Sequence, residues 1–123
     1  MKPDERRAAE RYEVTWSVDC ETPDTFLYAS ITNISALGIF VQTRDPLPVG
    51  TRMTLRFAPP AAEPFTLHGL VQWVNTFRPG GDNPNPGMGI RFTDLSGNDR
   101  ERLIDIIRTI AYVRDEAPPE RSN

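Results

Sequence analysis

The chain has 123 residues, 38% of them hydrophobic, and its 14 basic and 17 acidic residues leave a net charge of −3. This length suits one domain with one hydrophobic core. The acidic balance argues against a protein that coats duplex DNA, which needs a broad basic face. No apolar run approaches the roughly 18–20 residues of a membrane span, and the N-terminus lacks the apolar stretch of a secretory signal. The only cysteine, Cys20, cannot form an internal disulfide, so we expect a packing residue in a reducing cytoplasm.

The middle of the chain has the period of β-strands. Six segments combine alternating apolar positions with β-branched or aromatic residues and end at turn residues. These segments are 12–18, 25–34, 38–43, 52–57, 65–74 and 88–95. In the fifth segment Leu67, Val71 and Trp73 share one phase, which predicts that all three face the core. Six short strands predict a small antiparallel barrel or sandwich, because closing a sheet removes exposed strand edges.

The period changes to that of a helix after Asn98. Apolar residues recur there at helical spacing, namely Leu103, Ile106, Ile107 and Ile110. Asn98 followed by Glu101 resembles a capping box, in which each side chain satisfies a free backbone N–H of the first turn. We therefore expect a helix from Asn98 to about Val113 that covers one end or face of the barrel. Residues 114–123 are charged, contain proline and lack apolar anchors, which predicts a disordered tail.

The sequence offers little for catalysis. The only histidine, His68, lies in mid-strand out of phase with Leu67, which predicts a solvent-facing residue. His68 and Cys20 are far apart in the chain and make neither a zinc site nor a nucleophile–base pair. No glycine-rich loop fits a phosphate-binding strand–loop–helix pattern. We therefore expect neither an enzyme nor a bound metal or cofactor.

Three arginines are concentrated in the segment "ERRAAER", residues 5–11, of an otherwise acidic chain. Arg7 and Arg11 are spaced i, i+4, and in an extended or turn-like segment they can reach one ligand from two sides. Each guanidinium can donate two parallel hydrogen bonds to a phosphate, or to the O6/N7 edge of a guanine. The alternative is a solvated terminus or a helical turn without a ligand.

A second motif, "NISALG", occupies residues 33–38. Asn33 and Ser35 are two positions apart, so on an extended strand they share a face. There the amide and the hydroxyl can contact base edges and phosphate oxygens. Gly38 allows a sharp turn, or a close approach of the backbone to a ligand. The alternative is a turn between strands, in which Asn33 and Ser35 bond their own backbone.

Together, Arg-x-x-x-Arg before the first strand and Asn-x-Ser-x-x-Gly about twenty residues later resemble the PilZ domain, a bacterial receptor domain for cyclic di-GMP. The segments 38–57, 69–74 and 87–96 resemble the later PilZ strands in the same order. The resemblance covers roughly residues 5 to 113. The family accepts Asn or Asp at the first position of the second motif. Asn33 keeps the acceptor oxygen but lacks the formal charge.

The resemblance implies a six-stranded antiparallel β-barrel with one C-terminal α-helix, which agrees with the mainly β class expected from periodicity. It implies a stand-alone PilZ domain over residues 6–113, preceded by a flexible arm of residues 1–5. It also implies which residues bind cyclic di-GMP. Arg7 and Arg11 would hold phosphate and guanine, Asn33 and Ser35 would contact the guanine edge, and Gly38 would permit the turn.

Three further residues are candidate ligand contacts, each with an alternative. Arg6 could contact a second, stacked nucleotide, or be only an exposed charge. Similar PilZ chains carry a tryptophan near Trp73, and its ring could stack on a guanine, although its phase favours the core. Arg91 alternates outward in the last strand and could line the same surface, or lie on a solvated strand face.

The implied function is that of a cytoplasmic receptor and adaptor, a monomer or weak homodimer that binds no DNA or RNA and does not insert into a membrane. Ligand would order residues 1 to about 11 and create a surface for an unidentified downstream protein. One alternative is a PilZ-like adaptor that hardly binds the nucleotide. Another is a barrel for single-stranded nucleic acid, which needs a basic groove with exposed aromatics and is disfavoured by the net charge of −3.

Overall fold

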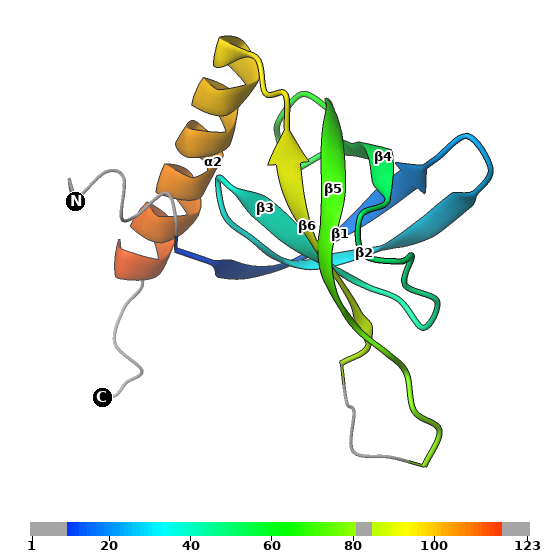
Figure 1. Ribbon diagram of the computed structural model, residues 1–123. Helices are drawn as coiled ribbons and strands as arrows, with labels where there is room; N and C mark the ends of the chain where they lie inside the picture. The colour runs from blue at the N-terminus through cyan, green and yellow to red at the C-terminus, as the bar shows by residue number, and fades with distance from the viewer. Residues whose placement is uncertain (1–9, 81–84, 117–123) are drawn as a thin grey trace.

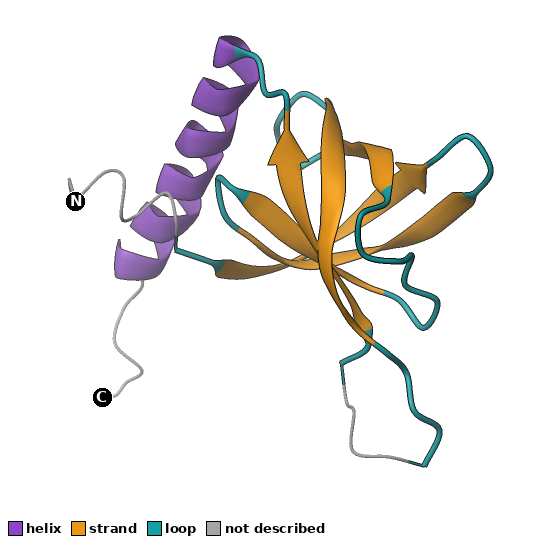
Figure 2. Ribbon diagram, in the orientation of Figure 1, coloured by secondary structure: helices purple, strands orange, loops and turns teal. Residues whose placement is uncertain are grey.

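The computed structural model describes residues 10–80 and 85–116. They form one closed antiparallel barrel with the strand order β1-β2-β3-β6-β5-β4, followed by one helix (Figures 1 and 2). The elements are β1 (Tyr12–Glu21), β2 (Phe26–Ile34), β3 (Gly38–Gln42), β4 (Arg52–Phe57), β5 (Phe65–Asn75), β6 (Gly87–Thr93) and α2 (Gly97–Glu116). The predicted six-stranded barrel with a C-terminal helix is confirmed. In the described part of the chain, no helix has the length and apolar character that crossing a membrane requires.

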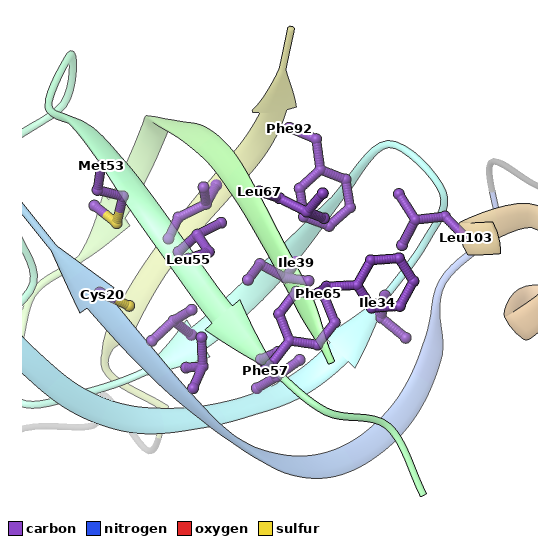
Figure 3. Close-up of a cluster of buried hydrophobic side chains, with 14 of the residues drawn as sticks. Cys20, Ile34, Ile39, Met53, Leu55, Phe57, Phe65, Leu67, Phe92 and Leu103 are labelled. Carbon is purple, nitrogen blue, oxygen red and sulfur yellow. The ribbon is translucent and has the colours of Figure 1, made fainter. Parts of the chain in front are cut away.

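The barrel is filled from the alternate positions of its strands. In β4, Met53, Leu55 and Phe57 are buried while Arg52 and Arg56 are exposed. One cluster of buried side chains joins all six strands and α2 (Figure 3). The helix adds apolar residues from one face, since it lies beside the barrel with that face inward; they are Leu103, Ile107 and Ala111. The sheet closure and the helix together bury the apolar face of each element.

β1 continues three residues beyond the predicted end at position 18. The alternation does not stop there, because Cys20 follows in the buried phase and pairs with Leu27 of β2 and Leu55 of β4. Cys20 is completely buried, so the prediction of a packing residue is confirmed. The expectation that His68 faces solvent is also confirmed.

The prediction that Trp73 belongs to the core is wrong. The register between β5 and β6 shifts after the pair Val71–Ile90, so that Trp73 lies opposite Gly89. Such a bulge adds one residue to one strand and inverts the phase of everything beyond it. Val71 is buried as expected, but the side chain of Trp73 is on the outer surface and is 52% exposed.

The N-terminal cap of α2 is two residues earlier than predicted. Ser96 Oγ accepts a hydrogen bond from the backbone N–H of Asp99 at 3.0 Å, and the Ser96 carbonyl accepts one from the Arg100 N–H at 3.0 Å. Ser96 is therefore the N-cap, and the capping box predicted at Asn98 is wrong. The helix also runs to Glu116, three residues past the predicted Val113. The rest of the expected tail and the expected arm 1–5 lie outside the described residues.

Replacing Ser96 with alanine should lower the free energy of unfolding by about 1 kcal/mol, since an N-cap hydroxyl contributes roughly that amount. Urea denaturation of the two proteins measures the difference. Asn98→Ala is the matched control and should change the free energy of unfolding by less than about 0.5 kcal/mol. A larger loss of unfolding free energy in Asn98→Ala than in Ser96→Ala would show that Asn98 is the N-cap.

The buried thiol predicts a loss of stability at alkaline pH. Burial, and secondly the charge of Asp19, raise the pKa of Cys20 to about 12. Because the unfolded thiol has a pKa of about 8.5, it deprotonates first as the pH rises. Between these two pKa values the unfolded chain binds fewer protons, so stability falls by up to about 1.4 kcal/mol per pH unit. Below the lower pKa the thiol is neutral in both the folded and the unfolded state, so it does not make stability depend on pH.

Comparison with Cys20→Ala isolates this effect from other groups that titrate at high pH. The variant should have lower stability at neutral pH but a shallower decline between pH values of about 9 and 11. Denaturant titrations at several pH values measure both slopes. Parallel pH profiles for the two proteins would contradict the assignment to Cys20.

Candidate functional site

The structure joins the two sequence motifs through one hydrogen bond. Arg11 directly precedes β1, and Asn33 lies one residue before the end of β2. The antiparallel pairing of these strands places Asn33 opposite Glu13. Arg11 Nε donates to Asn33 Oδ1 at 2.7 Å. Asn33 therefore bonds a side chain of the other motif rather than its own backbone.

This contact orients the Arg11 guanidinium without neutralising it. Asn33 is uncharged, so Arg11 keeps its full positive charge for an incoming anion. The two terminal nitrogens have no partner among the described residues. Partial burial lowers the pKa of Arg11 from its ordinary value, but an arginine in a protein stays protonated at physiological pH. With its oxygen facing Arg11, the Asn33 amide has its NH₂ group left to donate.

Ser35 and Gly38 hold the local fold. Ser35 is completely buried, and its Oγ accepts the backbone N–H of Leu37 at 3.0 Å. The Ser35 N–H donates to the Gly38 carbonyl at 2.9 Å and closes the turn between β2 and β3. For Ser35 the structure thus has the backbone contact considered as the alternative, and its ligand contact stays a prediction.

Gly38 is required by the approach of β6 rather than by a left-handed turn. Its backbone is not among the residues with positive φ. A Cβ built at this position would lie 2.2 Å from the carbonyl oxygen of Ile90, which is a backbone atom of the neighbouring strand. Only glycine permits this separation of β3 and β6.

A surface hollow of about 220 Å³ lies beside Arg11. Its walls come from the end of the Arg motif, the β2–β3 turn, β3, β5 and β6. The lining residues are Arg11, Leu37, Gly38, Ile39, Gln72, Trp73, Gly89, Ile90 and Arg91. Of the predicted contacts, the structure brings together Arg11, Gly38, Trp73 and Arg91 here, with Asn33 bonded to Arg11. Arg6 and Arg7 lie outside the described residues.

The side chain of Trp73 forms one wall of the hollow. The Trp73 ring stacks on Phe40, with centroids 5.3 Å apart and planes 25° from parallel. Gly89 leaves room for the indole, because a Cβ there would lie 2.2 Å from Trp73 Nε1. Gly87 likewise makes room for Phe40. Sequence reasoning missed Phe40, Gln72 and Gly89. The available signal was the alternation of glycine with Met88 and Ile90, which marks a close approach to the outer strand face.

A protein-family model for the PilZ domain matches residues 5–109. The chain belongs to the PilZ domain family. A comparison with curated protein sequences found no match. Solved structures that share the fold include three at 16–17% sequence identity, which establishes similarity of fold alone.

The first similar structure is the Bacillus subtilis inhibitor of motility MotI/DgrA (TM-score 0.68, 17% identity, 88% of this chain and 51% of that chain). The second is YcgR from Escherichia coli in complex with c-di-GMP (TM-score 0.73, 16% identity, 87% and 46%). The third is the PilZ domain of Escherichia coli YcgR with c-di-GMP (TM-score 0.66, 17% identity, 88% and 96%). This PilZ chain spans about half the length of the first two proteins.

The PilZ barrel has a second groove, of about 520 Å³, next to the first. Both grooves are lined by Leu37 and Arg91, and the second also contains Arg52 from β4 and Arg100 from α2. Among the described residues, none of these three arginines forms an ion pair. One acidic residue, Asp94, also lines the groove, so three arginines leave a net positive charge on this side of an acidic PilZ domain, where it can attract an anion. Sequence reasoning missed Arg52 and Arg100.

The described part of the PilZ domain offers no metal site of the usual kind. No group of three His, Cys, Asp or Glu side chains in residues 10–80 and 85–116 is placed to hold an ion. His68 lines another groove, on the outer face of β4 and β5, which shares Arg52 with the second groove and also contains Arg56.

Proposed function

We propose that this PilZ domain is a receptor for cyclic di-GMP that acts through a protein partner and not as an enzyme. The observation that carries the proposal is the 2.7 Å hydrogen bond from Arg11 to Asn33. It joins the two motifs of the family at the rim of a hollow whose wall is Trp73. Guanidinium, amide and exposed indole are the three groups that a guanine nucleotide needs for its phosphate, its base edge and its base face.

Each group has a distinct role in the proposed complex. The terminal nitrogens of Arg11 donate to a phosphate, or to the O6/N7 edge of a guanine, as a charge-assisted fork. The Asn33 NH₂ donates to a guanine acceptor. Trp73 offers its exposed face for stacking. The hollow of about 220 Å³ is below the roughly 300–1,000 Å³ of sites that enclose a drug-sized ligand. It therefore suits one base, with the remainder of the ligand on the surface.

Arg7 completes the proposed site by analogy with its motif, although it lies outside the described residues. Arg6 also lies outside the described residues and stays a candidate contact of a second nucleotide. Arg91 supports this second position from the structure, because it lines both the hollow and the neighbouring groove. Two stacked ligands carry four phosphate charges, which Arg52 and Arg100, unpaired among the described residues, help to offset.

The proposed signal is a change of surface beside the hollow. Leu37 and Trp73 are 55% and 52% exposed there. A bound nucleotide covers part of this apolar area and adds negative charge next to it, so a partner can distinguish the two states. The expected ordering of residues 1 to about 11 on binding would enlarge the same surface, and it concerns mainly residues outside the described ranges.

Isothermal titration of the full chain with cyclic di-GMP tests the proposal. We expect saturable binding that weakens as salt is raised, because the contacts are largely ionic. Cyclic di-AMP is the matched control and should bind much more weakly, since adenine lacks the O6 acceptor. A stoichiometry of two nucleotides per chain would bring Arg6 into the site, and one would leave it outside. Absence of binding would contradict the receptor function and favour a protein adaptor.

A further inference from the structure

The outer half of β2 has a neighbouring strand on one side only. β1 pairs with β2 from the pair Glu21–Phe26 to the pair Tyr12–Ile34, with one irregularity between Glu13 and Trp16. On the other side, β3 pairs only from Ser30 onward, where it faces Gln42. Within the described residues, the stretch Phe26–Ala29 thus forms a strand edge, although the order of the six strands closes the barrel.

The chain that leaves β3 does not cover this edge by pairing with it. After Gln42 the chain follows β6, since the Thr43 N–H donates to the Pro86 carbonyl at 3.1 Å. The guanidinium of Arg44 then lies 4.2 Å from the ring centroid of Phe77, in the loop after β5. Figure 1 shows the β1–β2 hairpin projecting to one side of the barrel, beyond the end of β3.

Backbone geometry identifies the groups that face the open edge. The hairpin is closed by a hydrogen bond from the Thr22 N–H to the Thr25 carbonyl at 2.8 Å. In an antiparallel pair, hydrogen-bonded and non-hydrogen-bonded positions alternate. Leu27 and Ala29 therefore exchange bonds with β1, whereas the N–H and C=O groups of Phe26 and Tyr28 point away from it. An edge with such groups is a template for another strand.

The side chains at these same two positions are apolar and exposed. Phe26 is 61% and Tyr28 is 69% exposed, and both lie on the outer face of β2. Proteins usually protect an open edge with lysine, proline or a bulge. Here two aromatic rings flank the open backbone groups, which favours association.

We propose that the occupant of this edge is the β2 strand of a second copy of this chain. In an antiparallel pairing about a two-fold axis at Leu27, Phe26 lies opposite the partner's Tyr28. Every edge-facing N–H and C=O of Phe26 and Tyr28 then meets its complement, and the two aromatic pairs form directly across the new interface. β3 blocks the edge from Ser30 onward, so the register cannot slide further.

Charge does not oppose the pairing of two copies. The stretch Phe26–Ala29 contains no charged residue, so no like charges face each other across the paired stretch in this register. The contact is isologous and closed, so it stops at a dimer. Tyr28 and Asn33 are five residues apart on β2, which is roughly 17 Å at about 3.3 Å per residue. The dimer therefore leaves the nucleotide hollow free and does not depend on the proposed function.

Sedimentation equilibrium of the full chain, without nucleotide, tests the dimer over micromolar to millimolar concentrations. We expect reversible dimerisation that Tyr28→Lys weakens about tenfold or more, since it removes both aromatic pairs and brings a charge to each. Tyr112→Lys is the matched control, because Tyr112 is 65% exposed on α2 and should leave dimerisation unchanged. Circular dichroism establishes that both variants are folded, and Phe26→Lys replaces Tyr28→Lys if that variant is not.

Amide hydrogen exchange of the unaltered chain tests the register directly. The amides of Phe26 and Tyr28 should exchange more slowly as the concentration rises, while those of Leu27 and Ala29 should not change, because they already bond to β1. A chain that stays monomeric at millimolar concentration overturns the proposal. So does a dimer that Tyr28→Lys and Tyr112→Lys weaken equally, or one in which the Phe26 and Tyr28 amides gain no protection.

Discussion

Replacing Arg11 with alanine is expected to weaken cyclic di-GMP binding by about 100-fold or more. The two terminal nitrogens of Arg11 have no partner among the described residues, and Arg11 lines the hollow in which we propose that the nucleotide binds. Loss of two charge-assisted hydrogen bonds, at roughly 1.5–3 kcal/mol each, removes at least about 3 kcal/mol, and about 1.4 kcal/mol is tenfold in affinity. Titration calorimetry of the two proteins measures the difference. Arg7→Ala should cause a similar loss if both arginines of the motif act together.

Two variants separate the geometry of Arg11 from its charge. Arg56→Ala removes the same charge from an exposed arginine that pairs with Glu21 at 2.6 Å, outside the hollow. Its affinity should stay within about threefold of the unaltered protein, because surface charges are largely screened. Arg11→Lys keeps the charge but loses the fork and the bond from Nε to Asn33, and we expect it to be at least tenfold weaker. If both Arg11 variants bind cyclic di-GMP with the affinity of the unaltered protein, the proposed role of Arg11 is rejected.

The barrel could be predicted from the sequence because each strand buries one side of itself. β4 is the clearest case, since Met53, Leu55 and Phe57 alternate in the sequence with arginine and threonine, and all three are buried. The change of period after residue 98 identified the helix for the same reason. These are local consequences of burying apolar surface, and they do not depend on which strands become neighbours.

The errors arose where the outcome depends on a neighbouring strand or on a choice between similar groups. The core assignment of Trp73 assumed a regular strand, but a bulge is created by the pairing of β5 with β6 and leaves no period in the sequence. At the start of α2, Ser96 and Asn98 are both good N-cap residues. Only the backbone geometry shows that the hydroxyl of Ser96 reaches the Asp99 N–H.

The residues of the candidate site also differ in whether they could be predicted from the sequence. Arg11 and Asn33 could be found because each belongs to a short linear motif. The stack of Trp73 on Phe40 could not be found in this way, because Phe40, Trp73 and Gly89 come from three strands that meet only through the order β3-β6-β5. The bulge that misplaced Trp73 in the sequence reasoning is thus the feature that turns its ring toward the hollow.

Replacing Gly38 with alanine is expected to lower the free energy of unfolding by about 3 kcal/mol. The added Cβ would meet the Ile90 carbonyl oxygen at 2.2 Å, and a backbone atom in the middle of a sheet cannot move aside without breaking the β3–β6 pairing. Overpacking of a well-packed interior costs about 1–3 kcal/mol and occasionally more. Urea denaturation measures the loss, which should appear with or without nucleotide, because Gly38 acts through the barrel.

Gly89→Ala is the informative partner of Gly38→Ala, since both add one methyl group to the walls of the same hollow. At Gly89 the methyl group would meet the ring of Trp73 at 2.2 Å, but this ring is half exposed and can rotate into solvent. The cost in stability should therefore be smaller, about 1 kcal/mol for the lost stack on Phe40. The affinity for cyclic di-GMP should fall about tenfold, because the stacking platform is displaced.

Gly97→Ala is the neutral control, because a Cβ at that position meets nothing within 4 Å. Equal losses of stability at Gly38 and Gly89 would mean that the indole is fixed in place and that both glycines serve the barrel alone.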